Sequence, residues 1–421
     1  MSQMTISQLE AFLTQLEDKE IKPQFQEEAT FYNMVSVNTS AQFVNGKGYK
    51  LHPYLRPDGS NAYFSEGGSF PAGGTQNFSN FYVFPLRYAK SFEVSGDYLE
   101  DLQSGQGSLL SFAEYIQMLN TSAIHELEEQ MFGDGTGTKS TSTTTSTSTW
   151  TGATAAATLY GSTKGTTQLL DSSTGAIYDH YNSSGTLVDA GVTFSSVSFT
   201  ASTATPTVAF SSNTAGDVLV WAGSYAKVPR GLAYIVNNDT GVFQSLSRST
   251  NQMIRSVVED ATNAGITVQI VSKLKKKLKY RSGVEAGGGL TVVTSLQQMD
   301  GYERLGYNLR RFGANDSTFD QSFEKIKHGD SQFIPALSCD EDRMYFLDMP
   351  DIQRYERKAF GFYDKDGLKL RQKAGSNATG ADAWYGNIGA KYTVGCKTPK
   401  NHGLIKRLSG TDLASMVGSW A

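Results

Sequence analysis

The segment MFGDGTGTKS at 131–140 has the composition of a phosphate-binding loop, with three glycines followed by a lysine and a serine. A P-loop requires its last glycine directly before the lysine, but here Thr138 separates Gly137 from Lys139. A dinucleotide-binding loop requires a third glycine where Thr138 stands. Phosphate loops also open a helix, because free N–H groups gather at its N-terminus. A helix is predicted before this segment, so we expect the glycines to form its left-handed C-terminal cap and to bind no nucleotide.

The histidines and carboxylates fit no metal-binding or catalytic spacing. His125 and Glu126 begin a zinc-protease pattern, but its second histidine would stand where Glu129 is found. One histidine among glutamates is expected on a solvated helix face. The segment DKDG at 364–367 lacks the remaining ligands of a calcium loop, and a β-turn is the simpler interpretation. The other histidines are scattered: His52, His180, His328 and His402.

No cysteine or serine lies in a recognisable nucleophile context. The chain has no G-x-S-x-G elbow, and neither Cys339 nor Cys396 belongs to a catalytic motif. Two distant cysteines without C-x-x-C predict no disulfide framework and suit a reducing compartment. We therefore predict no catalytic residue, no metal site and no cofactor, and a protein that is not an enzyme. A hydrolase, the alternative from that class, would need a constellation that the sequence lacks.

A lysine cluster lies in the segment TVQIVSKLKKKLKYRSG at 267–283. Ile270, Val271, Leu274 and Leu278 predict one apolar helix face, and lysines fill the rest. A solvated face is the simpler interpretation. A site for DNA or another acidic partner is the alternative, because clustered lysine attracts anions locally. The net charge of −4 over 421 residues argues against a dedicated nucleic-acid binder. The lysines are Lys273, Lys275, Lys276, Lys277 and Lys279.

A long helix and a hairpin precede the glycine-rich segment. Apolar residues every three or four positions predict a helix over 112–132, about 31 Å long, with Ser111 and Glu114 as a capping box. Before it, the arms GYKLHPYL and SNFYVFPLRYAKSFEVS predict a long β-hairpin. The hairpin has few consecutive apolar residues, so we expect it to project from the body and pack on another subunit.

The N-terminal segment 1–20 predicts an amphipathic helix with Ser7 and Glu10 as a capping box. It has neither a basic region nor an apolar run, so it is no secretion signal. No stretch approaches the roughly 20 apolar residues of a membrane span. We expect a protein made in the cytosol and without a membrane anchor.

The chain after the long helix changes character twice. Ser and Thr fill 11 of the 12 positions of 138–149, which predicts an exposed linker, and 150–224 predicts an inserted β-rich module, a small barrel or sandwich. Beyond it, GLAYIVNN predicts a strand, NQMIRSVVEDATNAG a helix closed by Gly265, LTVVT a buried strand and SLQQMDGYERLG a helix. This alternation predicts an α/β layer. Five C-terminal strands follow: QFIPALSC, RMYFLDM, IQRYERKAFGFYD, LKLRQKA and WYGNIGAKYTVGC.

Taken in order, these segments resemble the major capsid proteins of tailed bacteriophages, which have the Hong Kong 97-like fold. Residues 63–101 are similar to the extended loop of that family and the strand returning from it, 108–132 to its spine helix, and FGDGTGT to the turn that follows. GLAYIVNNDTGVFQSLSRS is similar to the return segment of members with a β insertion. The stretches 328–367 and 382–409 are similar to the C-terminal strands. The Ser/Thr tract and the length of the module depart from the family pattern, which leaves the outer decoration open.

The resemblance implies an α+β fold divided into an N-terminal arm, an extended loop, a peripheral domain, an inserted module and an axial domain. The expected ranges are 1–41 for the arm, 42–82 for the extended loop, 83–137 for the peripheral domain with its spine helix at 108–132, 138–224 for the linker and module, 225–250 for the return to the peripheral domain, 251–335 for the axial α/β domain and 336–421 for the C-terminal strands.

The resemblance also implies self-assembly into the icosahedral head shell of a double-stranded DNA bacteriophage. Expected partners are further copies in hexamers and pentamers, portal and scaffolding proteins, a decoration protein and non-specifically held DNA, in a shell assembled in the bacterial cytoplasm. Candidate interface residues on the extended loop are Arg56, Asp58, Glu66 and Phe70. Another virion protein, such as a head-decoration or tail component, is the alternative. Such a protein would not need the long helix or the α/β region.

Overall fold

The computed structural model describes residues 30–44, 46, 48–52, 54–56, 77–78, 80–97, 109–142, 178–192, 194–200, 203–208, 214–244, 246–282, 289–309, 327–328, 331–336, 338–363, 368–374 and 380–409. The predicted N-terminal helix, DKDG at 364–367, and the interface candidates Asp58, Glu66 and Phe70 lie outside the described residues.

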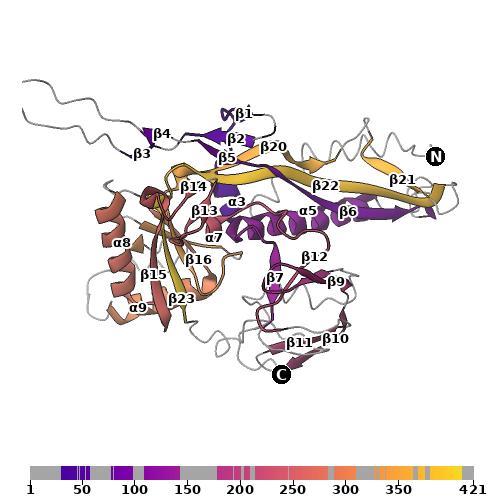
Figure 1. Cartoon of the computed structure of the whole chain (residues 1–421). Helices are drawn as coiled ribbons and strands as arrows, with labels where there is room; N and C mark the ends of the chain where they lie inside the picture. Colours follow the sequence, from indigo (N-terminus) through magenta and orange to yellow (C-terminus); the bar gives the residue numbers. More distant parts are fainter. Residues whose placement is uncertain are drawn as a thin grey trace, which may run out of the picture.

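A long helix and a long sheet form the spine of the molecule. Helix α5 (Leu109–Phe132) lies along a sheet whose central strand, β22 (Gly380–Cys396), is 17 residues long (Figure 1). Strands β20 (Ile352–Phe362) and β21 (Leu370–Ala374) pair along β22, and β6 (Leu86–Ser95) pairs with it as well, all antiparallel. The predicted helix is confirmed. The predicted capping box is wrong, because the helix begins at Leu109 and Ser111 lies inside it.

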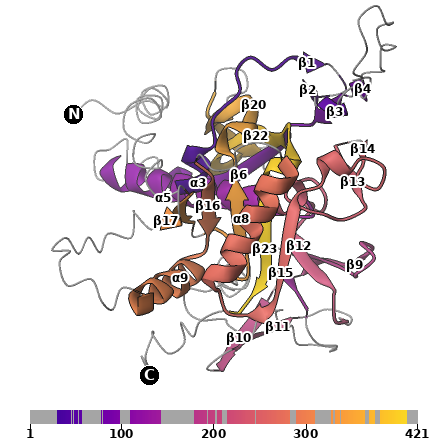
Figure 2. The ribbon, with the colours of Figure 1, turned by 90° about the vertical axis from the view of Figure 1, so that its left-hand side faces the viewer.

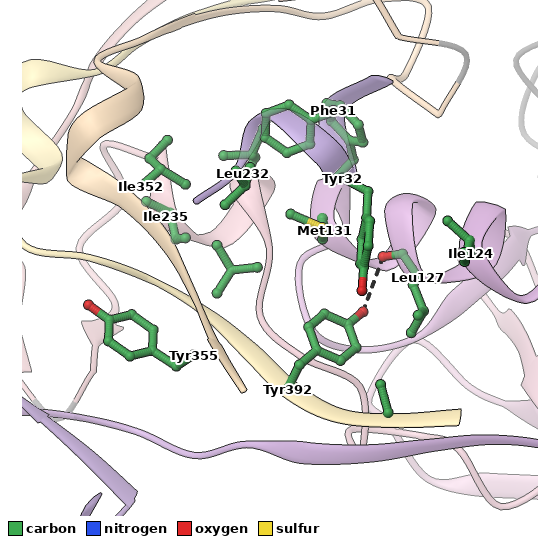
Figure 3. Packing of buried hydrophobic residues seen from close by; sticks show 14 of the residues in the cluster. Phe31, Tyr32, Ile124, Leu127, Met131, Leu232, Ile235, Ile352, Tyr355 and Tyr392 are labelled. Carbon is green, nitrogen blue, oxygen red and sulfur yellow. Dashed lines mark hydrogen bonds between the residues drawn. The ribbon is translucent and has the colours of Figure 1, made fainter. Parts of the chain in front are cut away.

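The main hydrophobic core lies between α5 and this sheet. Ala123, Leu127 and Met131 are fully buried on one face of α5, at the spacing that the sequence predicts. Tyr392 of β22 points at this face and donates a hydrogen bond from its hydroxyl to the Leu127 carbonyl oxygen at 3.1 Å (Figure 3). The short helix α3 (Thr30–Met34) adds Phe31, whose ring lies 4.8 Å from that of Phe132.

The extended hairpin leaves this core and projects from the body. At its base, β1 (Phe43–Val44), β2 (Gly48–Leu51) and β5 (Phe81–Val83) form a three-stranded sheet. Further out, β3 (Tyr54–Arg56) pairs with β4 (Asn77–Phe78) at the edge of the body (Figures 1 and 2). The predicted hairpin is confirmed in its described part.

The inserted module hangs below α5 in Figure 1. Strands β7 (Thr138–Thr141), β12 (Val218–Trp221), β8 (Tyr178–Tyr181) and β9 (Leu187–Val192) form an antiparallel sheet in that order, and β10 (Phe194–Thr200) pairs with β11 (Thr203–Val208). The predicted β-rich insertion is confirmed. The described strands form an open sheet and a separate hairpin rather than a barrel or sandwich. The linker prediction is wrong for 138–141, because this segment pairs with β12.

A six-stranded sheet forms the other main body. Its order is β15 (Val257–Ala264), β23 (Gly403–Leu408), β19 (Met344–Leu347), β16 (Thr291–Thr294), β18 (Ser331–Pro335) and β17 (Lys327–His328). Helices α8 (Val268–Ser282) and α9 (Leu296–Leu309) pack on one face, where Met344 and Phe346 point. Tyr345 and Leu347 point from the opposite face into the main core. The predicted α/β layer is confirmed.

Two predicted elements between the module and this sheet are wrong. GLAYIVNN contains a helical turn, α7 (Leu232–Ile235), and NQMIRSVVEDATNAG contains a 3-10 turn, η3 (Gln252–Ile254), followed by β15. Burial alternates along β15, with Val257, Glu259 and Ala261 buried. This segment is a strand because it pairs in parallel with β23, which is distant in the sequence. The local residue pattern carries no information about that partner. The remaining short elements are β13 (Val242–Phe243), β14 (Leu246–Ser247), η5 (Met349–Asp351) and η6 (Pro399–Asn401).

Candidate assembly surfaces

The glycines of GDGTG lie where the chain leaves the body for the inserted module. We call residues 133–138, which leave the body, and 226–231, which return to it, the neck. The Gly231 N–H donates to the Gly133 carbonyl oxygen at 3.0 Å, and the Ala226 N–H donates to the Thr136 carbonyl oxygen at 3.0 Å. The two passages of the chain therefore lie side by side, and the motif joins two parts of the fold.

Close packing explains why glycine is needed in the neck. A Cβ on Gly135 would lie 2.6 Å from Cγ of Arg230, and a Cβ on Gly231 would lie 2.2 Å from the Met131 carbonyl oxygen. The prediction that this segment ends a helix is confirmed. The predicted left-handed cap is displaced, because positive φ occurs at Gly135 (94°) and Gly137 (81°) and not at Gly133.

A cysteine and a histidine that the sequence did not associate form a buried pair. Nε2 of His402 lies 3.2 Å from Sγ of Cys396, and its Nδ1 accepts a hydrogen bond from the Asp348 N–H at 3.1 Å. Burial lowers the pKa of His402 to about 3 and raises the pKa of the Cys396 thiol well above its usual value. Both groups are thus neutral at pH 7. In an activated cysteine nucleophile the thiol is deprotonated and the imidazole is protonated, whereas here both groups are neutral, so we interpret this pair as structural.

His180 of the inserted module is fully buried between two carboxylates. Its Nδ1 lies 3.1 Å from Asp189 of β9, and its Nε2 lies 3.2 Å from Asp217, which precedes β12. Both contacts are hydrogen bonds only if each ring nitrogen carries a proton. Asp217 also accepts hydrogen bonds from the Thr214 and Ser183 N–H groups. This polar cluster joins three segments of the module, and no sequence motif predicts it, since its members lie 9 and 37 residues apart on different strands and loops.

Two of the five clustered lysines hold α8 on its sheet. Nζ of Lys273 lies 2.9 Å from Glu259 of β15, and Lys277 pairs with the same carboxylate. The side chain of Glu259 is only 7% exposed, so the buried carboxylate draws both lysines toward the sheet. The predicted helix and its apolar face are confirmed, with Val271, Leu274 and Leu278 fully buried. Lys275 is partly buried.

The outer side of α8 presents a different group, which we call the basic end: Lys276, Lys279, Tyr280 and Arg281. All four are exposed, and the Tyr280 ring is 94% exposed. Arg281 donates to the Ser256 carbonyl oxygen at 3.3 Å, which places this end of α8 beside the start of β15. Partial desolvation of the Arg281 guanidinium beside β15, and then the nearby Arg255 guanidinium, lower the pKa of Arg281. Positive charges thus gather here around an exposed aromatic ring, as the lysine spacing alone partly predicts.

Of the candidate residues on the extended loop, the structure places Arg56 alone. Its backbone lies in β3 opposite Asn77, and β3 contacts the turn η3 of the body.

Among the described residues, no three His, Cys, Asp or Glu side chains gather as a metal site, and none of the helices described is long and apolar enough to cross a membrane.

Compared with known proteins, the chain resembles solved structures in its fold but has no match by sequence. No family model and no curated protein sequence matches the chain. A chain from the capsid asymmetric unit of cyanophage A-1(L) superposes with a TM-score of 0.52 at 10% identity, over 92% of this chain and 93% of that one. A chain from the capsid of a native GTA particle gives a weaker match, with a TM-score of 0.45 at 9% identity over 91% of each chain. The expected α+β capsid fold of the Hong Kong 97-like type is therefore confirmed.

Proposed function

We propose that this chain is a major capsid protein, which assembles with its own copies into the head shell of a tailed double-stranded DNA bacteriophage. The observation that carries the proposal is the likeness to the cyanophage A-1(L) capsid chain, which extends over nearly the full length of both chains. A fragment or a single shared domain would not give that coverage.

The projecting hairpin supports assembly from an independent direction. The strands β3 and β4 form a sheet of only two strands, and β3 contacts the turn η3 at the edge of the body. An isolated two-stranded hairpin is marginally stable in water. We infer that it packs across a neighbouring copy, where apolar surface removed from water contributes about 25 cal/mol per Å². Many such contacts around a closed shell resist the pressure of packaged DNA.

In such a shell each region of the chain would have its own role. Residues 83–137 with 225–250 form the peripheral domain, 251–335 the axial domain, and 336–421 supply strands to both. Hexamers and pentamers, a portal and a scaffolding protein would be the partners, and the shell would form in the bacterial cytoplasm around non-specifically held DNA. The inserted module would face the outside of the shell, where a decoration protein would bind it.

Negative-stain electron microscopy tests the proposal directly. The full chain is expressed alone and then with the genes that neighbour its own. Closed angular shells or flat hexagonal sheets are the expected result. Monodisperse monomers or trimers in both preparations would overturn it.

A charge reversal tests the extended loop within the same assay. Glu66→Lys is expected to reduce shell yield while the subunit stays folded, because charges on this loop meet opposite charges on the next copy. Shell yield equal to that of the unmodified chain would remove Glu66 from the interface.

A further inference from the structure

Helix α8 carries positive charge without any acidic residue of its own. Its 15 residues include five lysines and one arginine. Glu259 of β15 pairs with both Lys273 and Lys277, whose side chains are still 60% and 50% exposed. Two exposed cations thus share one buried carboxylate, so even the part of α8 that is paired with the sheet presents positive charge to solvent.

Three further residues of α8 lie next to one another on its outer side. Residues three and four positions apart are neighbours on a helix surface, so Lys276 is adjacent to both Lys279 and Tyr280. All three are exposed, and neither lysine forms an ion pair within the part of the chain that the structure describes. Figure 2 shows α8 in front of the six-stranded sheet, against which its apolar face packs.

The composition of this surface favours a nucleic acid over a protein as its partner. Lysine is depleted at protein–protein interfaces, whose centres are rich in aromatic and apolar side chains. Every residue of α8 is described, and Tyr280 is its one large aromatic or apolar side chain that is exposed. Protein–DNA interfaces are polar and much more positively charged. Lysine and tyrosine side chains both donate hydrogen bonds to phosphate oxygens in them.

The packing of α8 limits such a contact to the DNA backbone. A helix is about 10–12 Å across and needs the whole width of the major groove, about 12 Å, to reach base edges. Val271, Leu274 and Leu278 hold one side of α8 against the sheet, so the helix cannot enter a groove as a whole. Only the long side chains on its outer side can reach DNA, and phosphates are the groups that they meet.

We propose that Lys276, Lys279 and Tyr280 bind the phosphate backbone of double-stranded DNA without regard to base sequence. This inference rests on the proposed function, because a shell subunit meets packaged DNA on the face that it turns to the interior. The two ammonium groups and the Tyr280 hydroxyl donate to phosphate oxygens, and Lys273 and Lys277 add to the attraction from a neighbouring line of the helix. The outer side of α8 therefore faces the interior of the shell.

Salt-dependent DNA binding by the full chain tests this site. Unassembled subunits are titrated against a fluorescently labelled duplex of mixed sequence, between about 50 and 200 mM salt. Lys276→Gln combined with Lys279→Gln should lower the slope of log Kd against log salt by about 2, because each lysine provides one phosphate contact. Tyr280→Phe removes a neutral donor, so it should weaken binding by about threefold and leave the slope unchanged.

The matched control is Arg87→Gln combined with Lys227→Gln. It also removes two exposed positive charges, one on β6 and one in the neck, and it should bind DNA as the unmodified chain does. Circular dichroism checks that every variant is folded. An unchanged salt slope in the Lys276 and Lys279 variant would overturn the site. An equal loss in the control would also overturn it, since binding would then follow net charge alone.

The shell assay separates this site from the proposed function. A Lys276 and Lys279 variant that binds DNA normally but forms no shells, where the unmodified chain does, would overturn DNA as the partner in favour of a contact between copies. Absence of shells from the unmodified chain would overturn the function and with it packaged DNA as the ligand. In that case the binding curves would still decide whether the three residues bind a duplex.

Chemical labelling of lysines tests the site inside assembled shells. DNA-filled and empty shells are treated with a small amine-reactive reagent, and the labelled peptides are measured by mass spectrometry. Lys276 and Lys279 should be labelled several-fold less in filled shells, whereas Lys227 should be labelled equally in both. Equal labelling of Lys276 and Lys279 in the two kinds of shell would overturn the site.

Discussion

The six-stranded sheet and the sheet of the inserted module are both built from short strands, but they bury different chemistry. The first is covered on both faces by apolar side chains that belong to two continuous hydrophobic clusters. The described part of the second contributes no residue to either cluster. Its buried residues are about evenly apolar and polar: Tyr178, Val192, Leu219 and Val220 against Ser142, Asp179, His180 and Asp217.

The two sheets are therefore stabilised by different interactions. Apolar burial is non-directional and tolerates neighbouring changes in packing, whereas a buried polar cluster is stable only with its hydrogen-bond partners in place. Asp179 shows the same dependence, since it accepts hydrogen bonds from the Gly191 and Gly223 N–H groups. We therefore expect the six-stranded sheet to lose most stability when a buried apolar side chain is made smaller. We expect the module to lose most stability when one partner of its buried polar cluster is removed.

Leu278→Ala should give the largest effect. The side chain is fully buried between α8 and the sheet, so a cavity should lower the free energy of unfolding by about 3–4 kcal/mol. Urea unfolding followed by circular dichroism measures it. Lys276→Ala, exposed on the same helix, should change it by less than about 0.5 kcal/mol. Equal losses from both variants would show that α8 is not held by its apolar face.

His180→Ala should act locally, with a loss of about 1–3 kcal/mol in the module, because the buried Asp217 carboxylate loses the imidazole that lies 3.2 Å from it. Hydrogen exchange read by mass spectrometry should show faster exchange in β8 and β12 and unchanged exchange in β19. If β19 exchanged faster to the same extent, the two regions would unfold together and the contrast between them would be lost.

Gly231→Ala tests the neck that joins the module to the body. The new Cβ would meet the Met131 carbonyl oxygen at 2.2 Å, and backbone cannot move aside as a side chain can. We expect a loss of about 1–3 kcal/mol. The control is Gly265→Ala, where nothing lies within 4 Å of the new Cβ and φ is not positive, so stability should hold or rise slightly. A neutral Gly231→Ala would show that the neck is loosely packed.

Acid should weaken the body through His402. Because burial lowers the folded-state pKa of His402 to about 3, the unfolded chain takes up a proton first as pH falls below about 6.5. The stability contributed by the neutral ring is complete above that pH and is lost toward pH 3, by about 1.4 kcal/mol per pH unit. His402→Asn should flatten the pH dependence of the urea midpoint over this window. An unchanged slope would assign acid unfolding to other groups.

The candidate surfaces were predictable from the sequence only in part. The lysine helix and its apolar face follow from spacing within one element. The role of Lys273 and Lys277 does not, because their partner Glu259 lies in a segment expected to be helical and found to be a strand. The partners of His180 and His402 come from other elements of the fold, so no local pattern reveals them.

Elements whose signal is local and repeated could be predicted from the amino-acid sequence. Helix α5, helix α8 and the C-terminal strands each carry enough periodic residues to be recognised, and their order carries the resemblance to capsid proteins. The secondary structure of the short or ambiguous segments depends on tertiary contacts. At 232–235 the chain turns into α7 where Gly231 packs against the end of α5, and at 257–264 it becomes a strand because β23 offers backbone partners. A local preference of a few tenths of a kcal/mol per residue is outweighed by hydrogen bonds and burial that only distant chain segments supply.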